Sequence, residues 1–325
     1  MIFFLRAPRR PAWSIGLLTF SLWLGTTTAP AWSLSWGRDY VPNVPLVTHE
    51  GQSVRLYDDL IKDKIFLINF IYAGCKEVCS LVTARMAQLQ QTLGERVGRD
   101  IFLYSVSIDP DHDTPAVLKA HAAAFHAGPG WLFLTGSPQD IAAVRHKLGE
   151  RGKGLRDHRN DAMAGNGATG EWERTSLFAD LNELALVVLN MDPAFRARRN
   201  AGPGTDYAFM TPVPYANQPG HALFAKLCTS CHTIGRGDLV GPDLQGVLTR
   251  RDRGWLAQYI QSPAAMRARL DPIAQELSMR FPGVSMPILG LSSTDVEDLL
   301  GYLAIRTGAS VSAPMPHHSL ERSHP

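Results

Sequence analysis

The chain has 325 residues, of which 45% are hydrophobic and 19% charged, and its formal net charge is +2. This length exceeds one typical domain and suits two, each large enough to bury a core of its own. The near balance of charge excludes a strongly basic or acidic field, so the composition does not support nucleic acid or a polyanionic substrate as a partner.

The N-terminal residues have the pattern of a secretory signal peptide. Three arginines in the first ten residues precede an apolar stretch from Trp13 to Gly25, and Ala29-Pro30-Ala31 follows as an A-x-A cleavage pattern. The stretch is shorter than the about 20 residues that span a bilayer, which favours a signal over an uncleaved anchor. We predict a signal peptide over 1–31 and an exported protein, in the periplasm or on the outer face of the cytoplasmic membrane.

Residues 40–191 alternate short apolar strands with amphipathic segments, as in an α/β domain. The run from Ile65 to Tyr72 is almost wholly apolar and predicts a central strand covered on both faces. A helix is predicted over 78–96, so Cys75 falls in the strand-to-helix turn and Cys79 on the first helical turn. A helix N-terminus stabilises a thiolate at that place.

The remaining elements of this domain follow in the order of a thioredoxin fold. Strands are predicted over 101–108 and 131–134, and helices after Thr114-Pro115, over 138–148 and over 180–191, with 166–170 as a turn between two short strands. A stretch rich in Arg, Gly, Pro and Asn comes next without helical or strand period. It predicts a linker over 192–216.

Residues 217–307 have a helical pattern that ends in a helix capped by Ser292 to Asp295. The tail over 308–325 contains His317, His318 and His324 and is predicted to be disordered. The expected fold class is therefore an α/β thioredoxin-like domain followed by a small all-α domain.

All four cysteines fall in two motifs, Cys75-Lys-Glu-Val-Cys79 and Cys228-Thr-Ser-Cys231-His232. None is left for a structural disulfide framework, which points to redox chemistry or soft-metal binding. The C-x-x-C-H motif is the attachment signature of a c-type haem, in which both cysteines form thioethers and the histidine ligates iron. A zinc site would need a second ligand pair, and no such pair is present.

The surroundings of the second motif resemble a class I cytochrome c over 217–307. The residues that carry the resemblance are Gly220, Phe224, Gly241-Pro242-Asp243-Leu244, Ser285-Met286-Pro287 and Tyr302. The resemblance assigns Cys228 and Cys231 to the thioether links, and His232 and Met286 to the axial positions of the iron. It also implies that the Pro242 carbonyl accepts a hydrogen bond from the His232 ring.

Met279 is the alternative to Met286 as the distal ligand. A methionine ligand raises the haem potential, and a filled sixth position implies electron transfer in place of chemistry at the iron.

The surroundings of the first motif resemble the Sco/SenC family of copper-handling thioredoxin-fold proteins over 40–191. The segments that carry the resemblance are 41–46, 58–60, 70–72, the C-x-x-x-C pair, 134–136 and, most specifically, the S-I-D-P-x-x-D-T-P run over 107–115. The family binds copper through two cysteines and a downstream histidine. The resemblance therefore implies Cys75 and Cys79 as redox thiols and copper ligands, with His158 as the third ligand.

The sequence departs from the family pattern next to His158. Arg159 stands where Ser or Thr is usual, and residues 159–162 are too polar for a buried strand. His112, His121 and His126 are the alternative ligands, the last two being interpreted as solvated surface of one helix. Asp109 and Asp113 are candidates for ordering the loop near the thiols.

Three functions are consistent with these features. The first is a copper metallochaperone or assembly factor for the copper subunit of a respiratory cytochrome oxidase, a membrane-associated partner, with a haem that exchanges electrons with the copper or thiol site. The second is a copper-independent thiol-disulfide oxidoreductase, the one enzymatic hypothesis. The third is a plain electron-transfer protein with a thioredoxin-like docking domain.

Electron stoichiometry favours the copper hypothesis. Protein dithiols lie at roughly −120 to −300 mV, and methionine ligation moves a haem higher, so electrons would flow from the thiols to the haem. One haem accepts one electron, whereas forming a disulfide releases two. A Cu(I)/Cu(II) step matches the single haem better.

Overall fold

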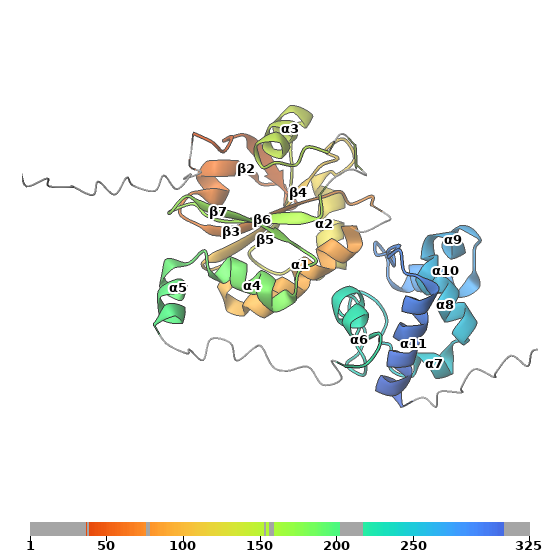
Figure 1. Cartoon of the computed structure of the whole chain (residues 1–325). Coiled ribbons are helices and arrows are strands. Elements are labelled where there is room, and N and C mark those ends of the chain that lie inside the picture. The colour runs from red at the N-terminus through yellow and green to blue at the C-terminus, as the bar shows by residue number, and fades with distance from the viewer. Residues whose placement is uncertain are drawn as a thin grey trace, which may run out of the picture. The chain divides into compact units, whose positions relative to one another are not determined.

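The computed structural model describes residues 37, 39–75, 79–152, 154–155, 159–201 and 217–308 (Figure 1). They form an α/β region over 39–201 and a helical region over 217–308, and each is described here by itself. The predicted signal peptide, most of the predicted linker and all of the predicted tail but Gly308 lie outside these residues. Within the described part of the chain, no helix is long and apolar enough to cross a membrane.

One mixed sheet of seven strands organises the α/β region, in the order β2-β1-β5-β4-β3-β6-β7. The three central strands β3, β4 and β5 run parallel, and the outer strands join them antiparallel. The strands are β1 (Pro45–Thr48), β2 (Ser53–Arg55), β3 (Ile65–Ile71), β4 (Ile101–Ser107), β5 (Trp131–Thr135), β6 (Asp161–Asn166) and β7 (Glu171–Ser176).

The helical segments of this region are η1 (Leu56–Ile61), α1 (Cys79–Leu93), η2 (Gly94–Arg96), α2 (Pro115–Ala124), α3 (Pro138–Lys147), α4 (Leu181–Leu189) and α5 (Pro193–Asn200). Side-chain caps set several of their starts, since Thr114, Ser137 and Asp180 each accept a backbone N–H of the helix that follows. The mixed sheet flanked by helices confirms the thioredoxin-like fold class.

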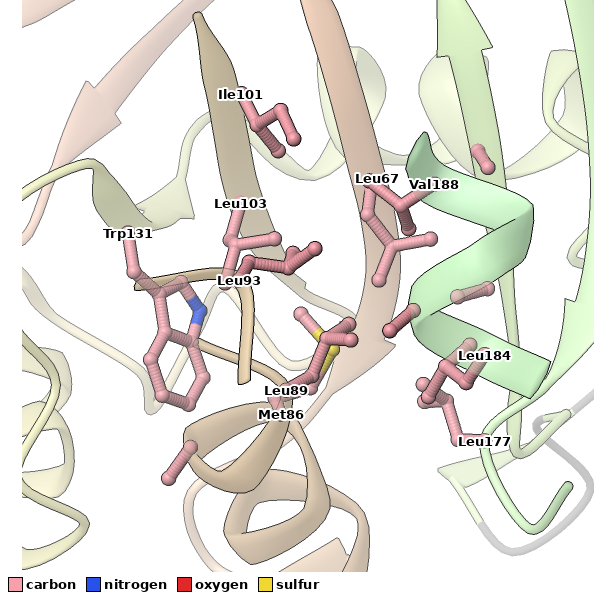
Figure 2. Close-up of a cluster of buried hydrophobic side chains, with 14 of the residues drawn as sticks. Leu67, Met86, Leu89, Leu93, Ile101, Leu103, Trp131, Leu177, Leu184 and Val188 are labelled. Atoms are coloured by element: carbon pink, nitrogen blue, oxygen red, sulfur yellow. The ribbon is translucent and has the colours of Figure 1, made fainter. Parts of the chain in front are cut away.

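Both faces of the central strands are buried, which explains the almost wholly apolar run of β3. Leu67 belongs to a core formed with Met86 and Leu89 of α1 and Val188 of α4 (Figure 2). Phe66, Ile68 and Phe70 belong to a second core that includes η1 and α3 residues. Successive side chains of a strand point to opposite faces, so only a strand covered on both sides needs every position apolar.

The start of the predicted linker is a helix, and that part of the linker prediction is wrong. Helix α5 begins after Asp192, whose carboxylate accepts the Ala194 N–H. Phe195 packs into the same core as α1 and α4, and Arg196 donates to both Glu171 carboxylate oxygens at 3.0 and 2.8 Å. A helix of eight residues with one buried side chain has too little apolar repeat to be recognised by periodicity.

The helical region consists of α6 (His221–Leu223), η5 (Phe224–Cys228), α7 (Val247–Arg250), α8 (Arg253–Gln261), α9 (Pro263–Ala268), α10 (Pro272–Arg280) and α11 (Ser293–Thr307). The predicted cap of α11 is confirmed, since Ser292 and Asp295 form a capping box. The Phe224 and Tyr302 rings lie 5.3 Å apart between centroids and join the first helical turns of the region to α11.

Gly220 shows why this contact needs glycine. Its φ is +76°, and a Cβ there would lie 2.2 Å from the Asp298 carbonyl oxygen. Any other residue would meet both backbone strain and a clash with α11. Gly220 therefore lets the chain approach the last helix closely before it enters the segment that carries Cys228.

Candidate redox sites

The first cysteine pair lies where β3 passes into α1. Cys75 closes the turn by donating its N–H to the Tyr72 carbonyl at 3.2 Å, and Cys79 is the first residue of α1, as predicted. The two cysteines form a disulfide with their Cα atoms 5.8 Å apart. Cys79 is 1% exposed, so the sulfur pair sits at the buried end of the turn.

Asp113 ties this turn to the loop after β4. Its buried carboxylate accepts the Ala73 N–H at 3.1 Å and the Ser107 hydroxyl at 2.6 Å. Burial raises the pKa of Asp113, and the hydrogen bonds from Ser107 and Ala73 oppose the rise. Asp109, the second loop acid considered, donates its own N–H to Ser107 Oγ at 3.0 Å and so supports the same network.

Two of the candidate histidines, His112 and His126, are exposed. His112 is exposed, and its Nδ1 lies 2.8 Å from Asp109 Oδ1, which raises its pKa. His126 follows α2 with a φ of +55°. The predicted third ligand, His158, lies outside the described residues.

His121 corrects an expectation, because it is buried and not solvated. It is 7% exposed, packs edge-on against Phe133, and its Nε2 lies 3.3 Å from Thr83 Oγ1. Burial lowers its pKa to about 4. The helical spacing contained a signal that was missed, since His121 comes three residues after Leu118 and four before Phe125, and both of those apolar side chains are fully buried.

The buried part of strand β6 begins after most of the polar residues that follow His158. Strand β6 begins only at Asp161, whose carboxylate pairs with Arg159 at 2.8 Å and Arg174 at 2.9 Å. From Ala162 onward the strand is buried. Of residues 159–162, the first two thus precede the strand, Asp161 is its first position and Ala162 is buried within it, while Arg159 donates its N–H to the buried Glu150 at 2.9 Å.

Within the described residues, no group of three or more His, Cys, Asp and Glu side chains is arranged to hold a metal ion. The two sulfurs of this motif, those of Cys75 and Cys79, are soft donors of the kind that suits Cu(I). The donor pair therefore fits copper once the disulfide is reduced.

The second motif lines an apolar cavity in the helical region. A neighbouring cavity shares several of its walls. The residues that line both are Cys228, His232, Pro242, Tyr259, Leu277, Met286 and Leu289, and Cys231 lines the first. Concave sites lined mainly by apolar side chains with a few polar groups are typical of cofactor sites.

The imidazole of His232 is oriented by the backbone. Its Nδ1 lies 2.8 Å from the Pro242 carbonyl oxygen, which is the contact that the cytochrome resemblance implies. Burial lowers the pKa of His232, and the Pro242 hydrogen bond opposes the shift, so the ring is neutral with Nδ1–H as donor. Gly241 allows the close packing, since a Cβ there would lie 2.7 Å from His232 Cε1.

The two candidate methionines differ sharply in position. Met286 lines both cavities with His232, whereas the Met279 side chain is 76% exposed. Two free thiols, one oriented imidazole and one thioether around an apolar cavity are the donor set of a c-type haem. The residues present therefore fit that group.

Asp243 organises the loop that carries Pro242. Burial opposes its ionisation, but N–H donors from Gln245, Gly235 and Gly237 outweigh this and lower the pKa of Asp243 to about 2. The three donor–acceptor distances are 2.7, 2.8 and 2.6 Å. The C-x-x-C-H motif contained no signal for this role or for Arg267, which contacts the Met286 carbonyl from 19 residues away.

The fold and the motifs define a thioredoxin-like domain joined to a helical domain of cytochrome c type. Comparison with known proteins agrees. Residues 37–163 match the SCO1/SenC family and residues 218–305 match the cytochrome c family. The chain therefore combines an SCO1/SenC domain with a cytochrome c domain.

Curated relatives match the first of these domains. An SCO1 protein homolog of Bacillus subtilis is 36% identical over 92 residues, which are 28% of this chain and 46% of that protein. Protein SenC of Rhodobacter capsulatus is 33% identical over 99 residues, which are 30% and 42% of the two chains. The matched segment thus spans less than half the length of either relative.

Among solved structures, Bradyrhizobium japonicum ScoI with copper bound is similar at a TM-score of 0.39 and 22% identity. The similarity covers 47% of this chain and 100% of that one.

Proposed function

We propose that this chain is an exported, copper-binding assembly factor of the Sco type that also carries one covalent haem c. Its target would be the copper subunit of a respiratory cytochrome oxidase, the partner that the family resemblance implies. The observation that carries the proposal is the presence, on one chain, of a thiol pair at a strand-to-helix turn and of a cavity walled by C-x-x-C-H and a methionine.

Cys75 and Cys79 are the proposed copper ligands, with His158 as the third. Copper can bind only after an external dithiol reductant supplies two electrons and two protons to the disulfide and is itself oxidised to a disulfide; the two thiols formed then lose their protons as they ligate the ion. Two thiolates select Cu(I), and an added imidazole nitrogen makes Cu(II) tolerable. The helix N-terminus at Cys79 supports the thiolate form.

Cys228 and Cys231 would hold the haem covalently, and His232 and Met286 would be its axial ligands. When bound, this group supplies one-electron transfer at a potential raised by the thioether ligand. The Pro242 carbonyl holds the proton of His232 on Nδ1 and so leaves Nε2 free to ligate.

If copper is the electron donor, each transfer step would involve one copper ion and one haem. Oxidation of Cu(I) to Cu(II) releases one electron, the number that one haem takes up. Oxidation of the free dithiol releases two electrons and would need two haem turnovers. We therefore expect the oxidation state of the copper, and not that of the free dithiol, to change together with the oxidation state of the haem.

The test is the copper content of the purified, exported, haem-containing protein and of its variants. C75S should abolish copper binding and leave the haem spectrum intact. H158A should weaken copper binding greatly, whereas H112A, which removes an exposed histidine bonded to Asp109, should not. Full copper binding by C75S would overturn the copper-site proposal.

The disulfide between Cys75 and Cys79 favours a second candidate, a copper-independent thiol-disulfide oxidoreductase. This function predicts reductase or oxidase turnover that needs both cysteines but is insensitive to H158A. Loss of turnover in C75S together with absence of copper from the wild-type protein would select it over copper handling.

A further inference from the structure

The segment that carries Met286 is held by very few polar contacts. It joins α10 to α11, and residues 284–292 have no regular secondary structure. Within residues 217–308, the hydrogen bonds made by 285–291 all come from one side chain, that of Arg267. Its Nη1 and Nη2 donate to the Met286 carbonyl oxygen at 3.3 and 3.4 Å.

The backbone of Arg267 and its neighbour Met266 are both held by contacts with other helices. Gln275 of α10 donates to the Arg267 carbonyl at 3.1 Å, which links α9 to α10. The neighbouring Met266 is buried with Tyr259 and Ala274 in a small core that Met286 also contacts. The guanidinium therefore projects from an anchored helix toward a segment that has no polar anchor of its own.

Arg267 also lines the apolar cavity with Met286 and His232. Hydrogen bonds from a charged donor are stronger than neutral ones, and a planar guanidinium can offer two N–H groups to one acceptor. A lysine at this place would keep the positive charge but could not offer two N–H groups from one planar group. Replacing Arg267 by lysine therefore separates the effect of the paired N–H donors from the effect of the charge.

We propose that Arg267 is the positioning residue of Met286: it holds the Met286 carbonyl, and thereby keeps the thioether directed into the cavity that His232 lines. The inference rests on the proposed function, because it concerns Met286 as an axial ligand of a covalent haem. Arg267 acts through the backbone of the ligand residue and is not itself a ligand.

The test compares R267Q and R267K with the wild-type full chain, purified with haem attached. Two readouts follow the methionine: the weak long-wavelength sulfur-to-iron band of the oxidised protein, and the affinity for added imidazole, which must displace Met286 to bind. R269Q is the matched control, because it removes the same charge from an exposed position two residues away.

We expect R267Q to weaken the band and to bind imidazole about tenfold more tightly, since a charge-assisted hydrogen bond no longer opposes opening of the segment. R267K should fall between R267Q and wild type, and R269Q should match wild type. If R267Q does not accumulate with haem, the comparison of R267K with R269Q tests the proposal by itself. In that case the proposal is overturned if R267K matches wild type in both the sulfur-to-iron band and the imidazole affinity.

Retention of the sulfur-to-iron band by R267Q, with an imidazole affinity within twofold of wild type, also overturns the positioning role of Arg267.

Failure of the proposed function would give a different result. If the wild-type protein lacks the sulfur-to-iron band, Met286 is not the ligand, whatever Arg267 does. Equal effects of R267Q and R269Q would show that charge alone matters and would refute the positioning role.

Discussion

Removal of the Asp113 carboxylate should loosen the turn that carries Cys75. In D113A the Ala73 N–H and the Ser107 hydroxyl, now at 3.1 and 2.6 Å from the carboxylate, lose their acceptor. Each net hydrogen bond contributes about 1 kcal/mol, and each unsatisfied buried donor costs about 1–3 kcal/mol. The expected local destabilisation is therefore about 3 kcal/mol.

Hydrogen–deuterium exchange of the oxidised full chain measures the local destabilisation at the Ala73 amide itself. The Ala73 amide should exchange about a hundredfold faster in D113A, since every 1.4 kcal/mol is about a factor of ten. D113N keeps an oxygen acceptor at the same place and should exchange at nearly the wild-type rate. D111A, which removes an exposed acid of the same loop, is the matched control.

Two results would refute this reasoning. Exchange in D113A within about threefold of wild type would show that the carboxylate does not hold the turn. Equal acceleration in D113N and D113A would show that the charge, and not hydrogen-bond acceptance, fixes the segment before Cys75.

Three further predictions concern pH and backbone fit. Burial raises the pKa of Asp113 above 3.8, so protonation of its carboxyl favours the folded state; this proton-linked stabilisation, which is separate from the hydrogen bonds that the group accepts, is complete below pH 3.8 and is lost as pH rises through the folded pKa, and denaturant unfolding of D113N should lack this dependence. The pKa of Asp243 is lowered to about 2 by its N–H donors, so its contribution is present above pH 3.8 and is lost as pH falls toward 2; acid titration of the haem spectrum should show this step in wild type and not in D243N. G220A should destabilise the helical domain by more than about 2 kcal/mol, because left-handed φ alone costs about 1–2 kcal/mol and the new Cβ meets the Asp298 carbonyl. G301A in the open middle of α11 should stabilise it by up to about 1 kcal/mol, and in thermal melts of the haem-loaded proteins a G220A melting temperature equal to that of wild type would show that the fit at Gly220 is unimportant.

Predictions from sequence succeeded where one local pattern decides the structure. The apolar run of β3, the helix start at Thr114-Pro115 and the capping box at Ser292 each depend on signals within a few residues. The position of Cys79 at the start of α1 follows from the same local signals. The resemblance to class I cytochromes c likewise implied the contact between His232 and Pro242, whose atoms lie 2.8 Å apart.

The sequence by itself determined the two-domain organisation, the order of elements from β3 to α4 and the identity of the cysteine motifs, because these depend on periodicity and spacing along the chain. Only the tertiary structure decided that β1 and β2 extend the sheet beyond β5, that α5 packs its Phe195 into the α/β core, and that Arg267 reaches Met286. Each of these depends on which side of an element meets another element, and that is decided by packing between residues distant in sequence. No pattern within one segment records it.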